Sequence, residues 1–370
     1  MRRTLGFVAC VAASACGFHI SPTAVDAGDS DGATDGIADG PSTTCVDSWF
    51  DAAWSSRKKI TIPDGKVTGS HTDFPVLIDV VVPAAQPTGN DLVFTRADGI
   101  TRVSHEIERY EAATGRLIAW VKVPMLSSTG TPALYLYYGN ATAANQQDRT
   151  AVWTADYSAV WHLRENPTGA APQVFDSTSQ ARHANARGLA AAAQTPGKIA
   201  GSLNFDGAND GLDIANVALG SSFSYEAWIH PTNNTDWHCI VNNSPAYNRW
   251  FGLYNEEIDF YTGGGFEYRE PAALTTGAWH HVVLSYDGAQ LKMFRDGVMQ
   301  GAPEPLGLPA VTSSFQIGYT NTSIGEWFAG RIDEVRVSSV ARSAAYIATA
   351  YANQNDPSMF YVVDAPQTCP

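Results

Sequence analysis

Carboxylate and amide side chains gather around two glycines in the stretch "NFDGANDGLDIAN", residues 204–216. Oxygen donors of this kind suit Ca²⁺, and paired carboxylates also serve in acid–base catalysis. Asp and Asn beside glycine equally favour a tight turn, because their side chains accept hydrogen bonds from the backbone two residues further on. The stretch therefore predicts a calcium loop, part of a catalytic carboxylate set, or a turn between two strands. The polar residues in question are Asp206, Asn209, Asp210 and Asp213.

A second group of acids lies in "EEIDFYT", where Glu257 and Asp259 are two residues apart. Alternate residues of a β-strand share one face, so both carboxylates are expected on the same side of a sheet. A retaining glycosidase needs two carboxyl groups about 5–5.5 Å apart. Asp333 and Glu334 in "GRIDEVRV" are adjacent, and their side chains are therefore expected on opposite faces of a strand.

Aromatic residues surround these acids in the stretch "RWFGLYNEEIDFYTGGGFEYRE". If the apolar residues between them face the core, three aromatic side chains share the outer face with the two carboxylates. A platform of this kind suits a sugar, which stacks on the rings and hydrogen-bonds to the acids. Cross-strand aromatic packing is the alternative. The predicted ligand-binding residues are Trp250, Tyr254, Glu257, Asp259 and Tyr261, with Trp237 as a possible addition from a loop.

Short stretches of alternating apolar and polar residues must position these groups. They recur through residues 46–150 and 151–350, separated by turn residues such as "PDG", "ADG" and "YDG". The pattern predicts an all-β protein with two β-sandwich domains, followed by a C-terminal tail, residues 351–370. The faces expected to be buried in the first sandwich contain Ile60/Ile62, Val76/Ile78, Ile118/Trp120 and Leu134/Leu136.

The first segment contains five motifs in a fixed order: "FPVLI", "DLVFTRADG", "HEIERY", "LIAWVKVP" and "LYLYYGN". In this order they resemble an uncharacterised bacterial envelope family that is known only as a domain of unknown function. The resemblance implies a location in the envelope and a fold. It implies no activity.

The second segment contains "SLNFDGANDGLDI", "SFSYEAWI", "WHHVVLSYDG" and "IDEVRV" in this order. It is similar to a laminin-G-like domain with the concanavalin A-like jelly-roll fold. Relatives of this fold include glucanases whose catalytic strand reads Glu-x-Asp-x-(x)-Glu. In "EEIDFYT" the last acid is replaced by Tyr261 or Thr262, and neither is a carboxylic acid whose pKa can be raised for proton donation. The resemblance therefore favours a non-enzymatic domain, with a divergent glycoside hydrolase as an alternative.

Many laminin-G-like domains hold one Ca²⁺ ion, and the matching motifs suggest three ligands here. The predicted metal ligands are Asp176 in "FDSTS", Asp206 in "FDGAND" and Asp333 in "RIDEV". The alternative is that these Asp residues cap turns. One structural Ca²⁺ ion is the only cofactor that the sequence suggests. On either reading "FDGANDG" ends a strand in a turn, and nothing in it looks catalytic.

Residues 1–15 have the features of a signal peptide, since two arginines precede the apolar run "LGFVACVAA" and small residues follow. The run "ASAC" resembles the lipobox of bacterial lipoproteins. This resemblance implies lipidation of Cys16 and an outer-membrane or cell-surface location, with ordinary cleavage and secretion as the alternative. Residues 16–45 are rich in Asp and poor in large apolar residues, which is typical of a flexible tether.

The chain has five cysteines. Once Cys10 of the signal peptide and Cys16 are set aside, Cys45, Cys239 and Cys369 remain. Export permits disulfides, and the two ends of a folded region often lie close together. We therefore expect a disulfide between Cys45 and Cys369, which leaves Cys239 free. Three unpaired thiols are the alternative.

The formal net charge of −14 argues against binding to nucleic acid, which needs clustered Lys and Arg. The function that fits best is non-catalytic recognition of carbohydrate or a surface polymer by the second domain, with membrane contact only through the lipid anchor. A structural or protein–protein adhesion module of the envelope is the alternative, and a divergent glycoside hydrolase is a second one.

Overall fold

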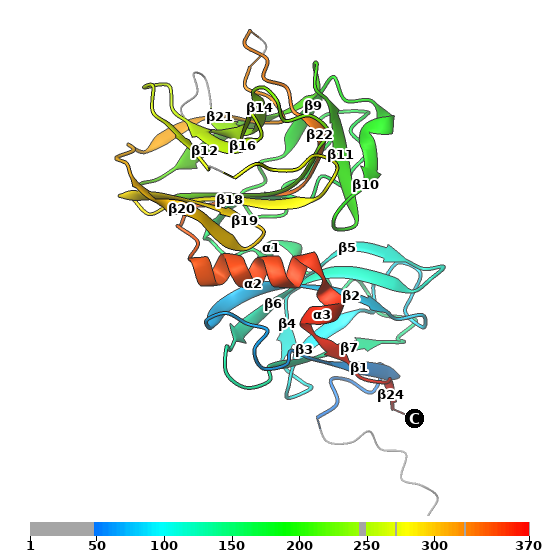
Figure 1. Cartoon of the computed structure of the whole chain (residues 1–370). Helices are drawn as coiled ribbons and strands as arrows, with labels where there is room; N and C mark the ends of the chain where they lie inside the picture. Colours follow the sequence, from blue (N-terminus) through cyan, green and yellow to red (C-terminus); the bar gives the residue numbers. More distant parts are fainter. Residues whose placement is uncertain (1–47, 244–248, 271, 322, 370) are drawn as a thin grey trace, which may run out of the picture. The chain divides into compact units, whose positions relative to one another are not determined.

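The computed structural model describes residues 48–370, except residues 244–248, 271, 322 and 370. The secondary structure is almost entirely β, which confirms the predicted fold class (Figure 1). The predicted signal peptide, the acidic tether and Cys16 lie outside the described residues. No helix in the described part of the chain has the length and apolar character that a bilayer-spanning segment needs.

The first sandwich consists of two antiparallel sheets that enclose one apolar core. The larger sheet contains, in order, β23 (Val362–Val363), β1 (Ser56–Thr61), β7 (Ala133–Tyr138), β3 (Val93–Arg96) and β4 (Arg102–Val103), with β24 (Gln367–Thr368) also paired to β1. The smaller sheet contains β2 (His71–Val81), β6 (Arg116–Leu126) and β5 (His105–Glu111). The core includes the predicted pairs Ile60/Ile62, Val76/Ile78 and Leu134/Leu136.

Strand β6 is buried on both faces, which differs from the prediction for Ile118 and Trp120. Leu117 and Ala119 point into the core of the first sandwich. Ile118 and Trp120 point the other way and join a separate apolar cluster with Val160 of the second sandwich. The strand therefore reads as a nearly continuous apolar run because each of its faces meets a different core.

Residues 351–370 form no separate tail, contrary to the expectation, because they return to the first sandwich. Val363 of β23 pairs with Ile60, and Thr368 of β24 pairs with Ser56. Helices α2 (Ala344–Asn355) and α3 (Pro357–Phe360) precede these strands. Phe360 lies in the core of the first sandwich. The first sandwich is therefore built from both ends of the described chain.

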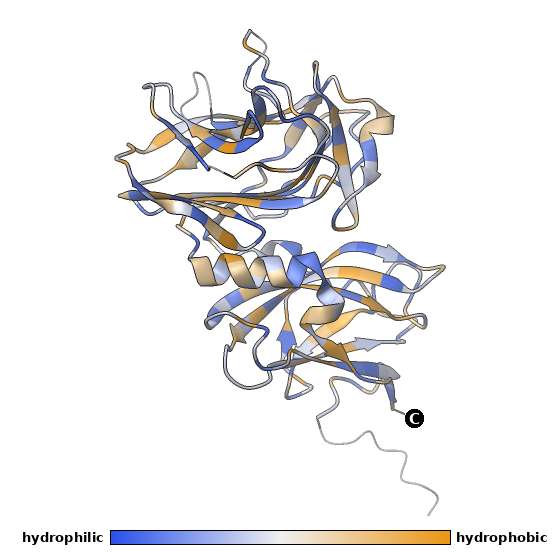
Figure 2. Cartoon of the chain, in the orientation of Figure 1, coloured by the Kyte–Doolittle hydropathy of each residue, from blue (hydrophilic) through white to orange (hydrophobic). Residues whose placement is uncertain are grey.

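The second sandwich also has two antiparallel sheets around an apolar core, and Figure 2 shows hydrophobic and hydrophilic residues alternating along its strands. The first sheet, called here the inner sheet, contains β10 (Gln194–Pro196), β11 (Gly201–Asp206), β22 (Ala329–Ser338), β13 (Phe223–Pro231), β18 (His280–Tyr286), β19 (Gln290–Arg295) and β20 (Val298–Pro305), with β8 (Tyr157–Trp161) paired to β22. The second, called the outer sheet, contains β17 (Glu267–Arg269), β16 (Glu257–Tyr261), β15 (Arg249–Tyr254), β14 (His238–Asn243), β21 (Val311–Ile317), β12 (Gly211–Leu219) and β9 (Ala184–Arg187). The short helices α1 (Arg149–Val152) and η1 (Ala191–Ala193) lie in the connections.

Helix α2 contacts both sandwiches. The side-chain amide of Asn353 donates to Leu77 O over 3.0 Å and accepts from Leu77 N over 2.7 Å, so it completes the backbone hydrogen bonding of β2. The next residue, Gln354, accepts a hydrogen bond of 2.7 Å from Trp228 Nε1 of the inner sheet. The helix therefore ties the inner sheet to the smaller sheet of the first sandwich.

Cys239 is free and buried, as predicted. Cys369 is buried at the end of the described chain. Cys45 lies outside the described residues, so a Cys45–Cys369 disulfide stays a prediction.

Candidate functional site

Strands β15 and β16 place the predicted aromatic residues on one face of the outer sheet. Trp250 pairs with Tyr261, and Tyr254 pairs with Glu257. The residues between them, such as Phe251 and Phe260, point into the core, so the period-2 pattern identified the outward face correctly.

Trp250 itself is not exposed, which corrects the prediction that it lines an open platform. Its side chain is 0% exposed, and its Nε1 donates a hydrogen bond of 2.9 Å to Thr320 Oγ1. Its ring meets the ring of Trp237 edge-on, with centroids 5.3 Å apart. A face that points away from the core can still be covered, and here a residue from a neighbouring loop covers it.

Trp237 is the half-buried residue at the outside of this aromatic cluster. Its ring centroid lies 4.1 Å from that of Tyr254 and 6.1 Å from that of Tyr261. The loop before β14 that carries Trp237 is held in place by Asn234, whose side chain donates to Leu274 O over 2.5 Å. The aromatic patch therefore consists of Trp237, Trp250, Tyr254 and Tyr261.

Charged groups from the edge strands rim the aromatic patch. The Arg269 guanidinium of β17 lies 4.2 Å from the ring centroid of Tyr254, a cation–π distance. Its Nε donates a hydrogen bond of 2.7 Å to Glu267 Oε1. Glu257 of β16 pairs with Tyr254 of β15 and is half-buried beside it. Arg269 and Glu267 were missed from the sequence, although their alternate positions in "EYR" opposite β16 are the signal that could have found them.

Asp259 is buried, so it does not offer its oxygens to a ligand as predicted. It is 0% exposed, and the nearest cation, Arg269 Nε, is 3.7 Å from its Oδ2. Burial, followed by the neighbouring Glu267 carboxylate, raises the pKa of Asp259 to about 8. Asp259 is therefore largely protonated at neutral pH.

The three predicted calcium ligands are not brought together. The Asp176 carboxylate accepts backbone hydrogen bonds from Val160, Thr178 and Arg182. Asp206 Oδ1 accepts from the backbone of Ala208 and Asn209 and so closes a turn, and Asp333 Oδ2 accepts from Ile199 N. Among the described residues these three form no group within ligand distance. Of the three readings of residues 204–216, a turn between β11 and β12 is the one that the structure supports.

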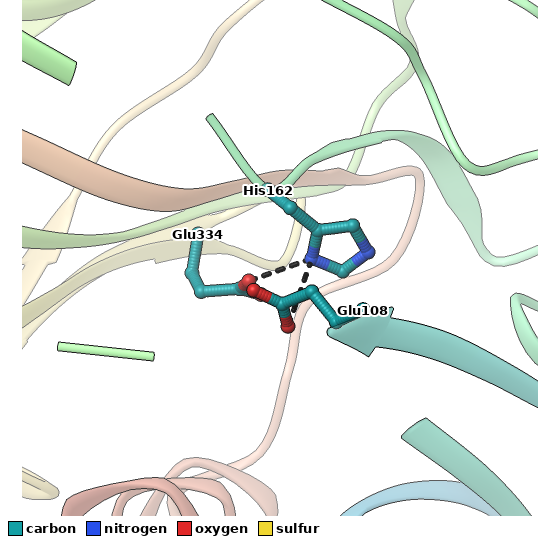
Figure 3. A group of neighbouring side chains, drawn as sticks. All are labelled: Glu108, His162 and Glu334. Carbon is teal, nitrogen blue, oxygen red and sulfur yellow. Dashed lines mark hydrogen bonds and ion pairs between the residues drawn. The ribbon is translucent and has the colours of Figure 1, made fainter. Parts of the chain in front are cut away.

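A different set of residues meets at the junction of the two sandwiches. Glu108 of β5, His162 directly after β8 and Glu334 of β22 point toward one another (Figure 3). His162 Nδ1 lies 2.6 Å from Glu334 Oε1 and 3.7 Å from Glu108 Oε2. The side chains are at most 2% exposed. This group is called the junction cluster.

A β-bulge in β22 turns Glu334 toward the junction. Pairing with β13 shifts between Arg336 and Asp333, and Glu334 has a φ of 52°, in the left-handed region that non-glycine residues rarely adopt. Ile332 and Val335 still face the core. The expectation that Asp333 and Glu334 lie on opposite faces is therefore wrong, because the extra residue of the bulge puts both outside the core.

The junction cluster is embedded in further buried charges. Arg336 donates from Nη2 to Glu334 Oε2 over 2.6 Å, and its guanidinium carbon lies 4.3 Å from the Trp120 ring centroid. Burial, followed by the Glu334 carboxylate, raises the pKa of Glu108 to about 8. Burial lowers the pKa of His162, but three surrounding carboxylates outweigh it and raise that pKa well above its ordinary value.

A pocket of about 470 Å³ opens beside the junction cluster. Its lining residues are Glu108, Arg109, Arg164, Gln194, Thr195, Pro196, Ala200 and Gly201. Glu108 thus belongs both to the pocket wall and to the cluster. A buried acid with a perturbed pKa at the base of a pocket is a common feature of functional sites.

Two family models match consecutive parts of the chain. Residues 88–183 match the family described as a domain of unknown function (DUF2341). Residues 206–348 match the family described as the concanavalin A-like lectin/glucanases superfamily. The chain carries a concanavalin A-like domain. It follows a DUF2341 domain in the predicted order, which confirms both resemblances and the jelly-roll fold of the second sandwich.

Three solved structures illustrate the likeness. Domain 4 of AbnA, a GH43 extracellular arabinanase from Geobacillus stearothermophilus in complex with arabinotriose, is 20% identical over 52% of this chain and 98% of that domain, with a TM-score of 0.43. The binding domain of Paraclostridial Mosquitocidal Protein 1 is 10% identical over 53% of this chain and 52% of that one, with a TM-score of 0.42. The botulinum neurotoxin serotype D ligand binding domain in complex with N-acetylneuraminic acid is 15% identical over 54% of this chain and 51% of that one, with a TM-score of 0.40. The chain thus spans about half of each toxin domain. No curated protein matches the sequence.

Proposed function

We propose that this protein is a non-catalytic carbohydrate-binding protein, and that its concanavalin A-like domain holds the sugar at the aromatic patch. The observation that carries the proposal is the placement of Trp237, which is half-buried, with its ring centroid 4.1 Å from that of Tyr254 and the two ring planes tilted by 31°. An indole fixed in this way presents a large apolar surface with little loss of side-chain entropy on binding. The family description is consistent with this role.

The rim of the patch supplies the polar contacts that a sugar needs. Glu257, Glu267 and Arg269 keep exposed surface beside the rings. Carboxylates accept hydrogen bonds from sugar hydroxyls, and a guanidinium donates them. The patch therefore combines an apolar body with donors and acceptors at its edge, the composition of a selective ligand site.

The place of action in this proposal is the cell surface. This part of the proposal has two components, a signal peptide at residues 1–15 and a lipid on Cys16. The acidic tether joins Cys16 to the two domains. A lipid anchor with this tether leaves the aromatic patch accessible to surface or environmental polysaccharide. Growth with a labelled fatty acid, followed by comparison of the wild-type chain with Cys16→Ser, tests the anchor.

Replacement of Trp237 by alanine tests the binding role. On a glycan array, and then by titration calorimetry with the glycans retained there, Trp237→Ala is expected to weaken binding at least tenfold, or about 1.4 kcal/mol. Trp279→Ala is the matched control, because Trp279 is also half-buried in the same domain but contacts His230 and Arg331. Equal binding by wild type and Trp237→Ala, or no retained glycan, contradicts the proposal and favours an adhesion module.

A divergent glycoside hydrolase is the second candidate, because Glu267 lies close enough to Asp259 to raise its pKa. A retaining glycosidase needs two neighbouring carboxyl groups, one of them a proton donor, and Asp259 with its raised pKa could serve as that donor. Two observations weigh against it: Asp259 has no exposed surface to touch a glycosidic oxygen, and Glu267 is held by Arg269. Release of reducing sugar by the wild-type chain, lost in Asp259→Asn, decides for the hydrolase.

A further inference from the structure

The atoms of the junction cluster are spaced like the ligands of a metal ion. One donor atom from each of Glu108, His162 and Glu334 lies within 4.8 Å of the other two. Donors bound at about 2.0–2.2 Å to a tetrahedral ion lie roughly 3.3–3.6 Å from one another. The side chains therefore need to move by about 1 Å to bind an ion, and Figure 3 shows both carboxylates directed at the imidazole.

We propose that Glu108, His162 and Glu334 bind one divalent transition-metal ion at the junction of the two sandwiches. The site is independent of the aromatic patch and of sugar binding. Glu108 comes from β5 of the first sandwich, and His162 and Glu334 come from the second sandwich, directly after β8 and on β22. The bound ion therefore links the two domains.

An unpartnered oxygen points to a missing cation. Glu108 is 1% exposed, yet its Oε1 has no hydrogen-bond partner among the described residues. Its other oxygen, Oε2, accepts a hydrogen bond of 2.8 Å from Trp120 Nε1, which fixes the carboxylate in place. A buried carboxylate oxygen without a donor is costly, and a metal ion supplies the missing interaction.

The donor set selects the class of metal. One imidazole nitrogen and two carboxylate oxygens suit Zn²⁺, Mn²⁺ or Fe²⁺, whereas Ca²⁺ and Mg²⁺ prefer oxygen alone. The surroundings resemble the outer shell of such sites. Arg336 orients Glu334 over 2.6 Å, and Glu106 Oε2 lies 3.3 Å from His162 Nε2 on the far side of the ring. A carboxylate at that position is the usual partner of a metal-binding histidine.

The pocket provides access to the site. Glu108 forms part of the pocket wall, so an ion can reach the cluster along this side chain, and water from the pocket can complete its coordination. The hydrogen bond between His162 Nδ1 and Glu334 Oε1 occupies the position that the ion takes. When the ion binds, the shared proton leaves to solvent and Nδ1 becomes a ligand through its lone pair.

Titration calorimetry of the metal-free full chain, without a histidine tag, tests the proposal with Zn²⁺ as the probe. We expect one Zn²⁺ ion per chain and a rise in the unfolding temperature on its addition. Glu108→Gln keeps an acceptor for Trp120 but loses the charge, and it is expected to weaken Zn²⁺ binding at least tenfold. Asp259→Asn removes another buried acid, outside the cluster, and is expected to bind Zn²⁺ like the wild type.

Three results overturn the metal site: no stoichiometric Zn²⁺ binding, unchanged affinity in Glu108→Gln, or an equal loss in Asp259→Asn. X-ray absorption of the Zn²⁺-loaded wild-type chain gives a readout that does not depend on a variant that folds. One imidazole with oxygen donors supports the site. A shell of oxygen alone, or one with sulfur or several imidazoles, contradicts it. Because no sugar enters either measurement, the outcome is separable from that of the binding function.

Discussion

The two outward faces of the concanavalin A-like domain have similar chemistry and different surroundings. On the outer sheet, the Arg269 guanidinium lies 4.2 Å from the Tyr254 ring, and both side chains keep exposed surface. On the inner sheet, the Arg336 guanidinium lies 4.3 Å from the Trp120 ring, and both are buried. In each case acids accompany the arginine. The difference is that the first sandwich and helix α2 cover the inner sheet.

This difference shows that burial by a second domain, more than residue composition, decides what a polar face can do. The outer face can exchange water for a ligand, which suits reversible sugar binding. The inner face is largely covered, and a pocket of about 470 Å³ opens beside Glu108. Charges there must be balanced within the protein. The predictions below test this contrast, from the largest expected effect to the smallest.

Removal of the buried arginine is expected to have the largest effect on stability. Arg336→Met leaves Glu226 and Glu334 without their guanidinium partner, and breaking a buried ion pair in this way destabilises by about 3–5 kcal/mol. Urea unfolding followed by tryptophan fluorescence measures the change. Arg331→Met, on the same strand but partly exposed, is the control, with an expected change below about 1 kcal/mol. Equal effects of the two variants contradict the contrast between the faces.

Truncation of the covered tryptophan on the outer face comes next. Trp250→Ala removes a fully buried ring and its hydrogen bond to Thr320, and we expect a loss of about 3 kcal/mol in the free energy of unfolding. Trp237→Ala, in the half-buried position, is expected to lose less than half of this. Chemical denaturation of both variants separates the supporting ring from the ligand-facing one. A larger loss for Trp237→Ala shows that Trp237 is structural.

The protonated acid under the patch gives a pH dependence. The pKa of Asp259 is raised to about 8 in the folded chain, so its contribution to stability is complete below pH 4 and is lost as the pH rises through 8. Between pH 5.5 and 9 this loss in the free energy of unfolding is about 3 kcal/mol. The side chain of Asp259→Asn cannot ionise. In this variant the difference in the free energy of unfolding between pH 5.5 and pH 9 is expected to be smaller than in the wild type by that amount. An equal difference in the two proteins indicates that Asp259 is charged throughout.

The smallest effect is expected at the start of the covering helix. Ser343 caps α2, because its side chain accepts a hydrogen bond of 3.1 Å from Tyr346 N. Ser343→Ala is expected to lower the free energy of unfolding by about 1 kcal/mol. Ser343→Asp keeps a hydrogen-bond acceptor and is expected to leave this free energy almost unchanged. Thermal unfolding compares the two. Equal losses in both variants show that the cap is unimportant for the cover over the inner sheet.

The alternating pattern was enough to predict much of the outer face. Trp250, Tyr254 and Tyr261 lie on the predicted side of their strands because side-chain direction has a period of two residues. The pattern could not show that Trp237 covers Trp250, since Trp237 lies in the loop before β14 and Trp250 lies on β15. It also missed Arg269, which reaches the patch from the neighbouring strand β17.

The sequence by itself determined the all-β class, the order of the two domains and the outward face of β15 and β16, because these depend on short-range periodicity and local motifs. Tertiary structure alone decided the junction cluster. Glu108 and Glu334 are more than two hundred positions apart in the sequence, and a bulge in β22 re-aims Glu334 against the regular alternation. Such a meeting depends on how two sheets pack, and no local spacing of residues encodes it.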